Sequence, residues 1–124
     1  MTTKTISLLV QGSPFSSQAC IHALDFAKAT IRKGHKLFRV FFHKDGVLIA
    51  NCPYHLPFDE RDMQQEWIDF ATECNMKLFI CVAACERRGL QIPRALEVNY
   101  PFQFAGLGQL TEAMVESDRL VAFL

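Results

Sequence analysis

Short apolar runs alternate with longer helical periods in the N-terminal part of the chain. Residues 5–10 are rich in aliphatic side chains and end at Gln11-Gly12-Ser13-Pro14, which predicts a strand followed by a turn. Apolar residues then recur at helical spacing as far as Gly34, and the serines at 16–17 are available as caps. These apolar positions are Cys20, Leu24, Ala27 and Ile31. Residues 36–42 predict a second strand, which completes a strand–helix–strand unit.

The middle of the chain predicts a second long helix after a loop. Val47 to Ala50 predict the start of a short helix, and the proline-containing residues 51–58 predict a loop. We expect the following helix to be capped by Asp59 and to stop at Asn75. Its apolar face consists of Met63, Trp67, Phe70 and Cys74.

The most apolar stretch of the chain follows. Residues 77–80 have the clearest pattern of a buried strand, and the apolar run continues to Cys85 before the charges at 86–88. We interpret this stretch as a strand that passes into a short helix. Residues 90–100 predict a loop with a weak helical turn, and Tyr100 to Ala105 predict a fourth strand.

A glycine-containing turn introduces the last two elements. Gly106-Leu107-Gly108 precede a helix with Leu107, Leu110 and Met114 on one stripe, which ends at Asp118-Arg119. Residues 120–124 predict a last strand. The alternation of strands and helices predicts a single α/β domain over residues 1–124. We expect a flavodoxin-like, mostly parallel five-stranded sheet with helices on both faces.

The composition excludes several classes of function. Half of the 124 residues are hydrophobic and eleven are Phe, so we expect a packed core and some apolar surface covered by partner subunits. Thirteen basic residues balance thirteen acidic ones, which is unlike the basic footprint of a direct nucleic-acid binder. The apolar runs at 6–10 and 78–85 are too short for a secretory signal or a membrane span. These features favour a soluble, cytoplasmic protein.

One cysteine of the chain stands out by its position. The chain has Cys20, Cys52, Cys74, Cys81 and Cys85, an odd number without a zinc-binding spacing, so we expect neither a disulfide framework nor a metal. Cys81 lies where the third strand passes into a helix. Unpaired N–H groups at a helix start favour a thiolate, and a thiolate can attack a sulfane sulfur. On position alone, the alternative is a buried cysteine at a strand end.

Four segments that follow predicted strands should meet at the carboxyl edge of the sheet, where ligands collect in open α/β folds. These segments are residues 11–17, 43–50, 81–88 and 105–109. Besides Cys81, this edge would receive His43, which could assist proton transfer. It would also receive Arg87 and Arg88, which could steer an acidic carrier or stabilise a thiolate. The alternatives are a surface histidine and a solvated helix end.

Several segments resemble one protein family. Residues 78–89 read Leu-Phe-Ile-Cys-Val-Ala-Ala-Cys-Glu-Arg-Arg-Gly. They resemble the active-site stretch of DsrE/TusD-type sulfurtransferase subunits, with its apolar strand, one cysteine, small-residue turn and Arg-Arg-Gly ending. Residues 41–47, 104–110 and 118–123 resemble that family's second strand, Gly-Leu-Gly turn and last strand. The resemblance therefore extends over nearly the whole chain.

The resemblance implies a sulfur-relay subunit without cofactor or metal, in which Cys81 carries the sulfur as a persulfide. It implies a hexamer with related DsrE-like subunits, a TusA-type sulfur donor and a TusE- or DsrC-type acceptor. The pathway would be 2-thiolation of a tRNA wobble uridine or sulfur oxidation. Cys85 departs from the family pattern, because a small apolar residue is expected there, and it leaves open a second thiol near the first.

Two other interpretations compete with the relay. The first is a flavodoxin-like module that binds a nucleotide or another small molecule without catalysis. Gly12-Ser13-Pro14 lacks the Ser/Thr-Gly-Asn richness of a loop that cradles phosphate, which weighs against this reading. The second is a subunit that only scaffolds the assembly, although a scaffold needs no thiol at a strand end.

Overall fold

Five parallel strands form the centre of the molecule. The computed structural model describes residues 2–50, 61–90 and 101–124. Within these residues the strands form one sheet in the order β4-β3-β2-β1-β5, and every neighbouring pair is parallel. The strands are β1 (Thr5–Val10), β2 (Lys36–Phe42), β3 (Leu78–Cys81), β4 (Phe102–Ala105) and β5 (Arg119–Phe123). The predicted parallel five-stranded sheet is therefore confirmed.

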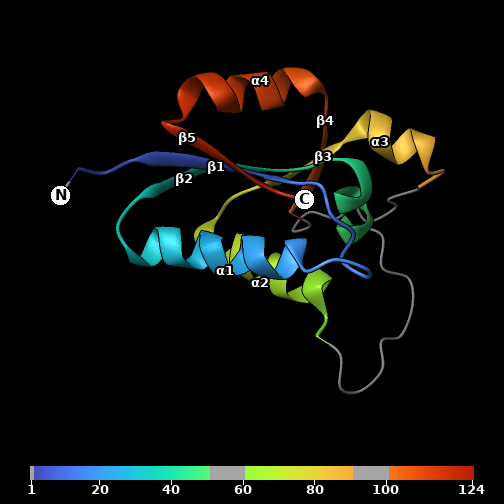
Figure 1. Ribbon diagram of the computed structural model, residues 1–124, viewed down its shortest axis with the longest axis horizontal. Helices are drawn as coiled ribbons and strands as arrows, with labels where there is room; N and C mark the ends of the chain where they lie inside the picture. The colour runs from blue at the N-terminus through green and yellow to red at the C-terminus, as the bar shows by residue number, and fades with distance from the viewer. Residues whose placement is uncertain (1, 51–60, 91–100) are drawn as a thin grey trace.

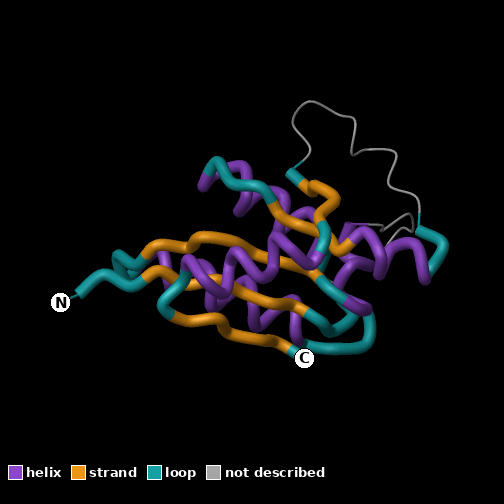
Figure 2. Tube along the Cα trace, turned by 90° about the horizontal axis from the view of Figure 1, so that it is seen from above, coloured by secondary structure: helices purple, strands orange, loops and turns teal. Residues whose placement is uncertain are grey.

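Helices cover both faces of the sheet, as predicted. Helices α1 (Ala19–Arg32) and α2 (Met63–Cys74) lie on one face, and α4 (Leu107–Glu116) lies on the other (Figure 1). Strands β1 to β4 are added in one direction, and the chain then returns to the far side of β1 for β5. Right-handed crossovers place α4 opposite the other helices for this reason. Figure 2 shows the strands side by side along the long axis of the molecule.

Two short helices lie at the carboxyl ends of the central strands. The 3-10 helix η1 (Lys44–Ala50) follows β2, and α3 (Val82–Arg87) follows β3. The two helices pack against each other. The sequence predicted both, although η1 begins three residues earlier than the expected start at Val47. Together they form the part of the carboxyl edge that contains Cys81.

Aromatic side chains hold α2 on the sheet. Trp67 is fully buried and meets Phe42 of β2 and Phe70 edge-on, at centroid distances of 5.3 and 5.8 Å. Its indole Nε1 donates to the carbonyl of Cys20 in α1 at 3.2 Å. Phe102 of β4 packs against Phe42 at 6.3 Å. One tryptophan thus joins two helices and the sheet, and it satisfies its polar atom in doing so.

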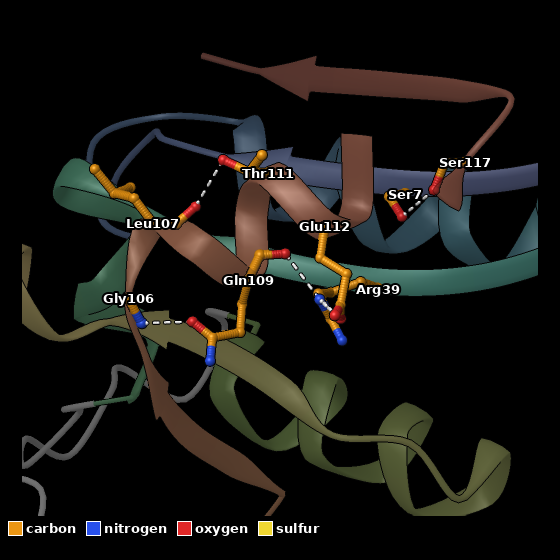
Figure 3. A network of polar contacts seen from close by, with 8 residues as sticks. All are labelled: Ser7, Arg39, Gly106, Leu107, Gln109, Thr111, Glu112 and Ser117. Atoms are coloured by element: carbon orange, nitrogen blue, oxygen red, sulfur yellow. Dashed lines mark hydrogen bonds and ion pairs between the residues drawn. The ribbon is translucent and has the colours of Figure 1, made fainter. Parts of the chain in front are cut away.

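Helix α4 is fastened to β2 by Arg39 (Figure 3). The guanidinium Nη1 donates to the carbonyl of Gln109 at 2.8 Å and pairs with the Glu112 carboxylate at 2.8 Å. This attachment turns Ala113 onto the sheet, where it is buried, and leaves Met114 exposed. Of the predicted apolar stripe, Leu110 packs against the core, whereas Leu107 and Met114 are 52% and 56% exposed, so the stripe only partly faces the sheet.

The helix ends agree only in part with the sequence prediction. Asn75 ends α2 in the left-handed conformation at φ 52°, as predicted. The cap at the start of α2 is Asp62, whose side chain accepts from the Gln65 N–H at 3.1 Å, because the helix begins at Met63. The predicted cap Asp59 and the predicted loop at 51–58 lie outside the described residues. So does the loop predicted at 90–100, apart from Leu90.

Candidate functional site

Cys81 occupies the junction that the sequence predicted. It is the last residue of β3, pairs with Ala105 of β4, and is the N-cap residue of α3. Its backbone is still extended, with φ −65° and ψ 115°, and its side chain makes no capping hydrogen bond. The residue is buried, with 1% of its surface exposed. A thiolate at an N-cap position lies beside first-turn N–H groups that have no helical partner, and such groups stabilise negative charge.

Cys85 lies one helical turn after Cys81 and is also buried. Burial and, to a lesser extent, the neighbouring Cys81 raise the pKa of the Cys85 thiol to about 11, whereas Arg88 acts in the opposite direction. Cys85 is therefore protonated at neutral pH. Since the thiolate is the nucleophile, a buried and protonated Cys85 is poorly suited to attack a sulfane sulfur. Cys85 is instead part of the hydrophobic core.

His43 lies at the same edge, at the end of β2. The backbone N–H of His43 donates to the carbonyl of Val10 at 2.9 Å, and the ring Nδ1 is 3.4 Å from Nε2 of Gln11. Desolvation lowers the pKa of the His43 imidazole, and the positive charges of Lys44, Arg87 and Arg88 lower it further. The imidazole is therefore neutral at pH 7. The structure thus brings the loops after β1 and β2 and the end of α3 together, as the fold predicted.

Arg88 ties α3 to η1. Its Nε and Nη2 atoms both lie 2.9 Å from Oδ1 of Asp45, and its Nη1 donates to the carbonyl of Ala84 at 3.1 Å. Arg88 is therefore not the freely solvated helix end that the sequence left as an alternative. Asp45 was part of the family resemblance, but no local pattern in the sequence indicated this pairing.

The remaining loops of the edge use their polar groups internally. The Ser13 hydroxyl accepts from the Phe15 N–H at 3.0 Å, and a Cβ on Gly12 would lie 2.5 Å from the Ser17 hydroxyl. The Gly106 N–H donates to the side chain of Gln109 at 3.0 Å. A loop that cradles phosphate presents free N–H groups and room for the anion. This packing does not favour the flavodoxin-like binding module.

Neither a metal cluster nor a membrane helix is found in the described part of the chain. No three His, Cys, Asp or Glu side chains gather there in a way that could hold an ion. Across residues 2–50, 61–90 and 101–124, every helix is too short or too polar to cross a bilayer. Of the described cysteines, Cys74, Cys81 and Cys85 are free thiols, and Cys52 lies outside the described residues.

The chain that combines this parallel sheet with a cysteine at the junction of β3 and α3 belongs to a known family. The chain is a member of the DsrE/DsrF-like family, which it matches over residues 4–123. The sulfurtransferase TusD of Photorhabdus laumondii is 39% identical over 99% of this chain and 100% of its own length. A protein of Allochromatium vinosum that carries the name sulfurtransferase DsrE is 38% identical over 94% of this chain and 96% of its own length.

A solved structure shares the fold. The ychN protein from E. coli superposes with a TM-score of 0.74 and covers 98% of this chain and 100% of its own chain. Its sequence identity is 21%, so the comparison supports the architecture and not a particular activity. The family resemblance seen in the sequence is confirmed by the family match and by the relatives.

Proposed function

We propose that the chain is a sulfurtransferase subunit of a sulfur relay and that it carries sulfur as a persulfide on Cys81. The observation that supports this most is the position of Cys81. It ends a strand next to the centre of the sheet and caps α3, in a chain whose relatives are named sulfurtransferases. Cys85 is packed and protonated, so the sulfur rests on Cys81 alone.

Loading is a thiol exchange that needs no oxidant. The Cys81 thiolate attacks the outer sulfur of a donor persulfide, R–S–SH, and the S–S bond of the donor breaks. The products are a persulfide on Cys81 and the donor thiolate, so electrons balance within the pair. In this proposal the neutral His43 imidazole at the same edge accepts and returns the persulfide proton.

Unloading repeats the same chemistry in the other direction. A thiolate of the acceptor attacks the outer sulfur of the Cys81 persulfide, and the Cys81 thiolate leaves. A cysteine whose thiolate is stabilised by a helix start is a good leaving group, which favours transfer. The protein then returns to its original state and needs no reductant.

For the partners we propose those that the family resemblance in the sequence implies. We place the chain in a relay complex with related DsrE-like subunits, as a hexamer that receives sulfur from a TusA-type donor and passes it to a TusE- or DsrC-type acceptor. The pathway is thiolation of a tRNA wobble uridine or sulfur oxidation. Large apolar side chains that the single chain leaves exposed, such as Leu107, Met114 and Val115, are consistent with an assembly. Light scattering of the chain alone and with such subunits tests this point, and a monomer in both samples would contradict it.

Mass spectrometry tests the central step. The purified chain is incubated with a low-molecular-weight persulfide, and we expect the intact mass to increase by one sulfur atom and to return after treatment with a reductant. Cys81→Ser should not load, whereas Cys85→Ala, the matched control from the same helix, should load like the wild type. Equal loading of Cys81→Ser and wild type would show that Cys81 is not the carrier.

A further inference from the structure

Cys81 is buried in the structure, although transfer between proteins requires contact with its sulfur. Cys81 and Cys85 are 1% and 2% exposed. An incoming thiolate must reach the outer sulfur of a persulfide in line with the S–S bond, which a buried side chain does not permit. Some local opening must therefore precede transfer, in the manner of the local unfolding that exposes buried groups in native proteins.

Helix α3 is the element whose displacement would expose Cys81. Cys81 is its N-cap residue and Cys85 lies within it, so both thiols depend on where this helix sits. The helix has only six residues, which is short for an independent helix, and its Val82 side chain is 37% exposed. Its position therefore depends on what fastens it to its surroundings.

The Arg88 guanidinium fastens the C-terminal end of α3. Through Nε and Nη2 it binds Asp45, and through Nη1 it binds the Ala84 carbonyl of the same helix, with all three distances between 2.9 and 3.1 Å. This fork holds the helix and η1 together as one arrangement, which a lysine could not reproduce. The ion pair is at the surface, since the side chains of Arg88 and Asp45 are 29% and 58% exposed.

The other side of this contact is rigid. Gly46 follows Asp45 in η1, and a Cβ at Gly46 would lie 2.2 Å from the carbonyl oxygen of Val10. The same carbonyl accepts from the His43 N–H at 2.9 Å, and the Gly46 N–H donates to the His43 carbonyl at 2.9 Å. Helix η1 is thus seated on the end of β1. When the ion pair breaks, α3 is the partner free to move.

We propose that Arg88 is a positioning residue that, through Asp45, holds α3 in place next to its N-cap residue Cys81 and sets how often the thiol becomes accessible. This role deepens the proposed function, because the rate of sulfur transfer would then include the opening of α3. The opening itself does not require Cys81 to carry sulfur. An exposed ion pair is worth little to global stability, so its loss should release α3 without unfolding the domain.

Alkylation of the individual cysteines by iodoacetamide, followed by peptide mass spectrometry, measures this opening. Cys81 and Cys85 report on α3. Cys20, a fully buried residue of α1, reports on global unfolding, and the partly exposed Cys74 shows that the reagent is active. We expect Asp45→Asn to accelerate labelling of Cys81 and Cys85 about two- to fivefold, as the loss of an exposed ion pair allows, with Cys20 unchanged.

Two further variants separate opening from a change in charge. Arg88→Gln removes a positive charge, which by itself would disfavour thiolates and slow labelling, whereas release of α3 accelerates it. Glu66→Gln breaks the ion pair between Arg61, which precedes α2, and Glu66 in its first turn, whose closest distance is 2.7 Å; the labelling of Cys81 and Cys85 should not change. The double variant Asp45→Asn/Arg88→Gln should label like Arg88→Gln alone, because the two residues act through each other.

Three results would overturn the proposal. The first is an unchanged rate of Cys81 labelling in both Asp45→Asn and Arg88→Gln. The second is a parallel rise for Cys20, which would mean global unfolding. The third is an equal effect of Glu66→Gln. If Arg88→Gln opens α3 but Cys81 never accepts sulfur, the proposed function fails while the positioning role stands, so the two failures are distinguishable.

Discussion

The buried thiol of Cys85 lies one turn after Cys81 in α3, and the proximity of Cys81 is second only to burial in raising the pKa of Cys85 to about 11. Two thiols so close together could act as a pair, with Cys85 attacking a persulfide on Cys81 to release sulfide and form a disulfide. Protonation of Cys85 opposes this attack. The relationship therefore favours one sulfur carrier with a packed neighbour.

Replacing Cys85 tests that conclusion. We expect Cys85→Ala to load sulfur on Cys81 and to pass it to an acceptor thiol at the wild-type rate. The reason is that the Cys85 thiol of the wild type is not ionised at neutral pH and takes no part in transfer. Persulfide lifetime and transfer are followed by intact mass, with Cys74→Ala as a control outside the site. Loss of transfer with loading intact would instead establish a relay of two cysteines.

Local sequence patterns predicted the junction that contains Cys81. The apolar run through residues 78–85, followed by the charges at 86–88, gives both the strand and the short helix. The alternation of elements gave the parallel sheet, because parallel neighbours require crossovers. The sequence alone was enough to group the edge residues, since the carboxyl ends of parallel strands meet at one edge of the sheet.

Contacts between distant segments were beyond the same patterns. Arg88 and Asp45 are 43 residues apart, and nothing near either residue indicates the other. The orientation of α4 was predicted only in part, since Leu110 packs against the core but Leu107 and Met114 do not. Helical periodicity identifies its apolar stripe, but the bond from Arg39 to the Gln109 carbonyl decides which side meets the sheet. Side-chain pairing across the fold, and not local propensity, determines both features.

His43 should make the free energy of unfolding depend on pH in the acidic range. Its pKa is lowered in the folded protein, first by desolvation and then by Lys44, Arg87 and Arg88. The unfolded chain therefore binds a proton at a higher pH than the folded one. Stability must then fall as the pH drops through the ordinary histidine pKa of about 6.5 toward the lower folded value.

Urea unfolding at about pH 8 and about pH 5.5, on either side of that ordinary value, measures the effect. We expect His43→Asn to lose less stability between the two conditions than the wild type does. His22→Asn, which removes an exposed histidine, is the control. An equal loss in His43→Asn and wild type would mean that His43 does not carry this pH dependence.

Trp67 should be a main determinant of stability. It is fully buried, packs edge-on against Phe42 and Phe70, and donates to the Cys20 carbonyl. Trp67→Ala should lower the free energy of unfolding by about 3–5 kcal/mol, as the loss of a large buried aromatic group does. Trp67→Phe keeps a ring and should cost less, so it remains measurable if the alanine variant does not fold. The exposed Glu73→Ala on the same helix should change stability by less than about 0.5 kcal/mol. A similar, small change for all three variants would contradict this assignment.

Replacing Gly46 and Gly108 by alanine should change the stability of the protein in opposite directions. A Cβ at Gly46 would lie 2.2 Å from the Val10 carbonyl oxygen, so Gly46→Ala must push η1 away from the end of β1. A Cβ at Gly108 meets nothing within 4 Å, and the residue lies in the first turn of α4. Gly108→Ala should therefore be neutral or stabilising by up to about 1 kcal/mol, because alanine has the better helix propensity. Gly46→Ala should destabilise by more than about 1 kcal/mol, in the range of overpacking substitutions.

The two glycine variants also separate the site from the scaffold. Because η1 carries Asp45, Gly46→Ala should weaken the hold on α3 and accelerate iodoacetamide labelling of Cys81, whereas Gly108→Ala should not. Urea denaturation gives the stabilities, and labelling is compared below the unfolding transition, where Cys20 remains protected. If Gly46→Ala were as stable as the wild type, the close approach of η1 to β1 would not exist in solution. Helix η1 would then not be the rigid partner of the Arg88–Asp45 contact.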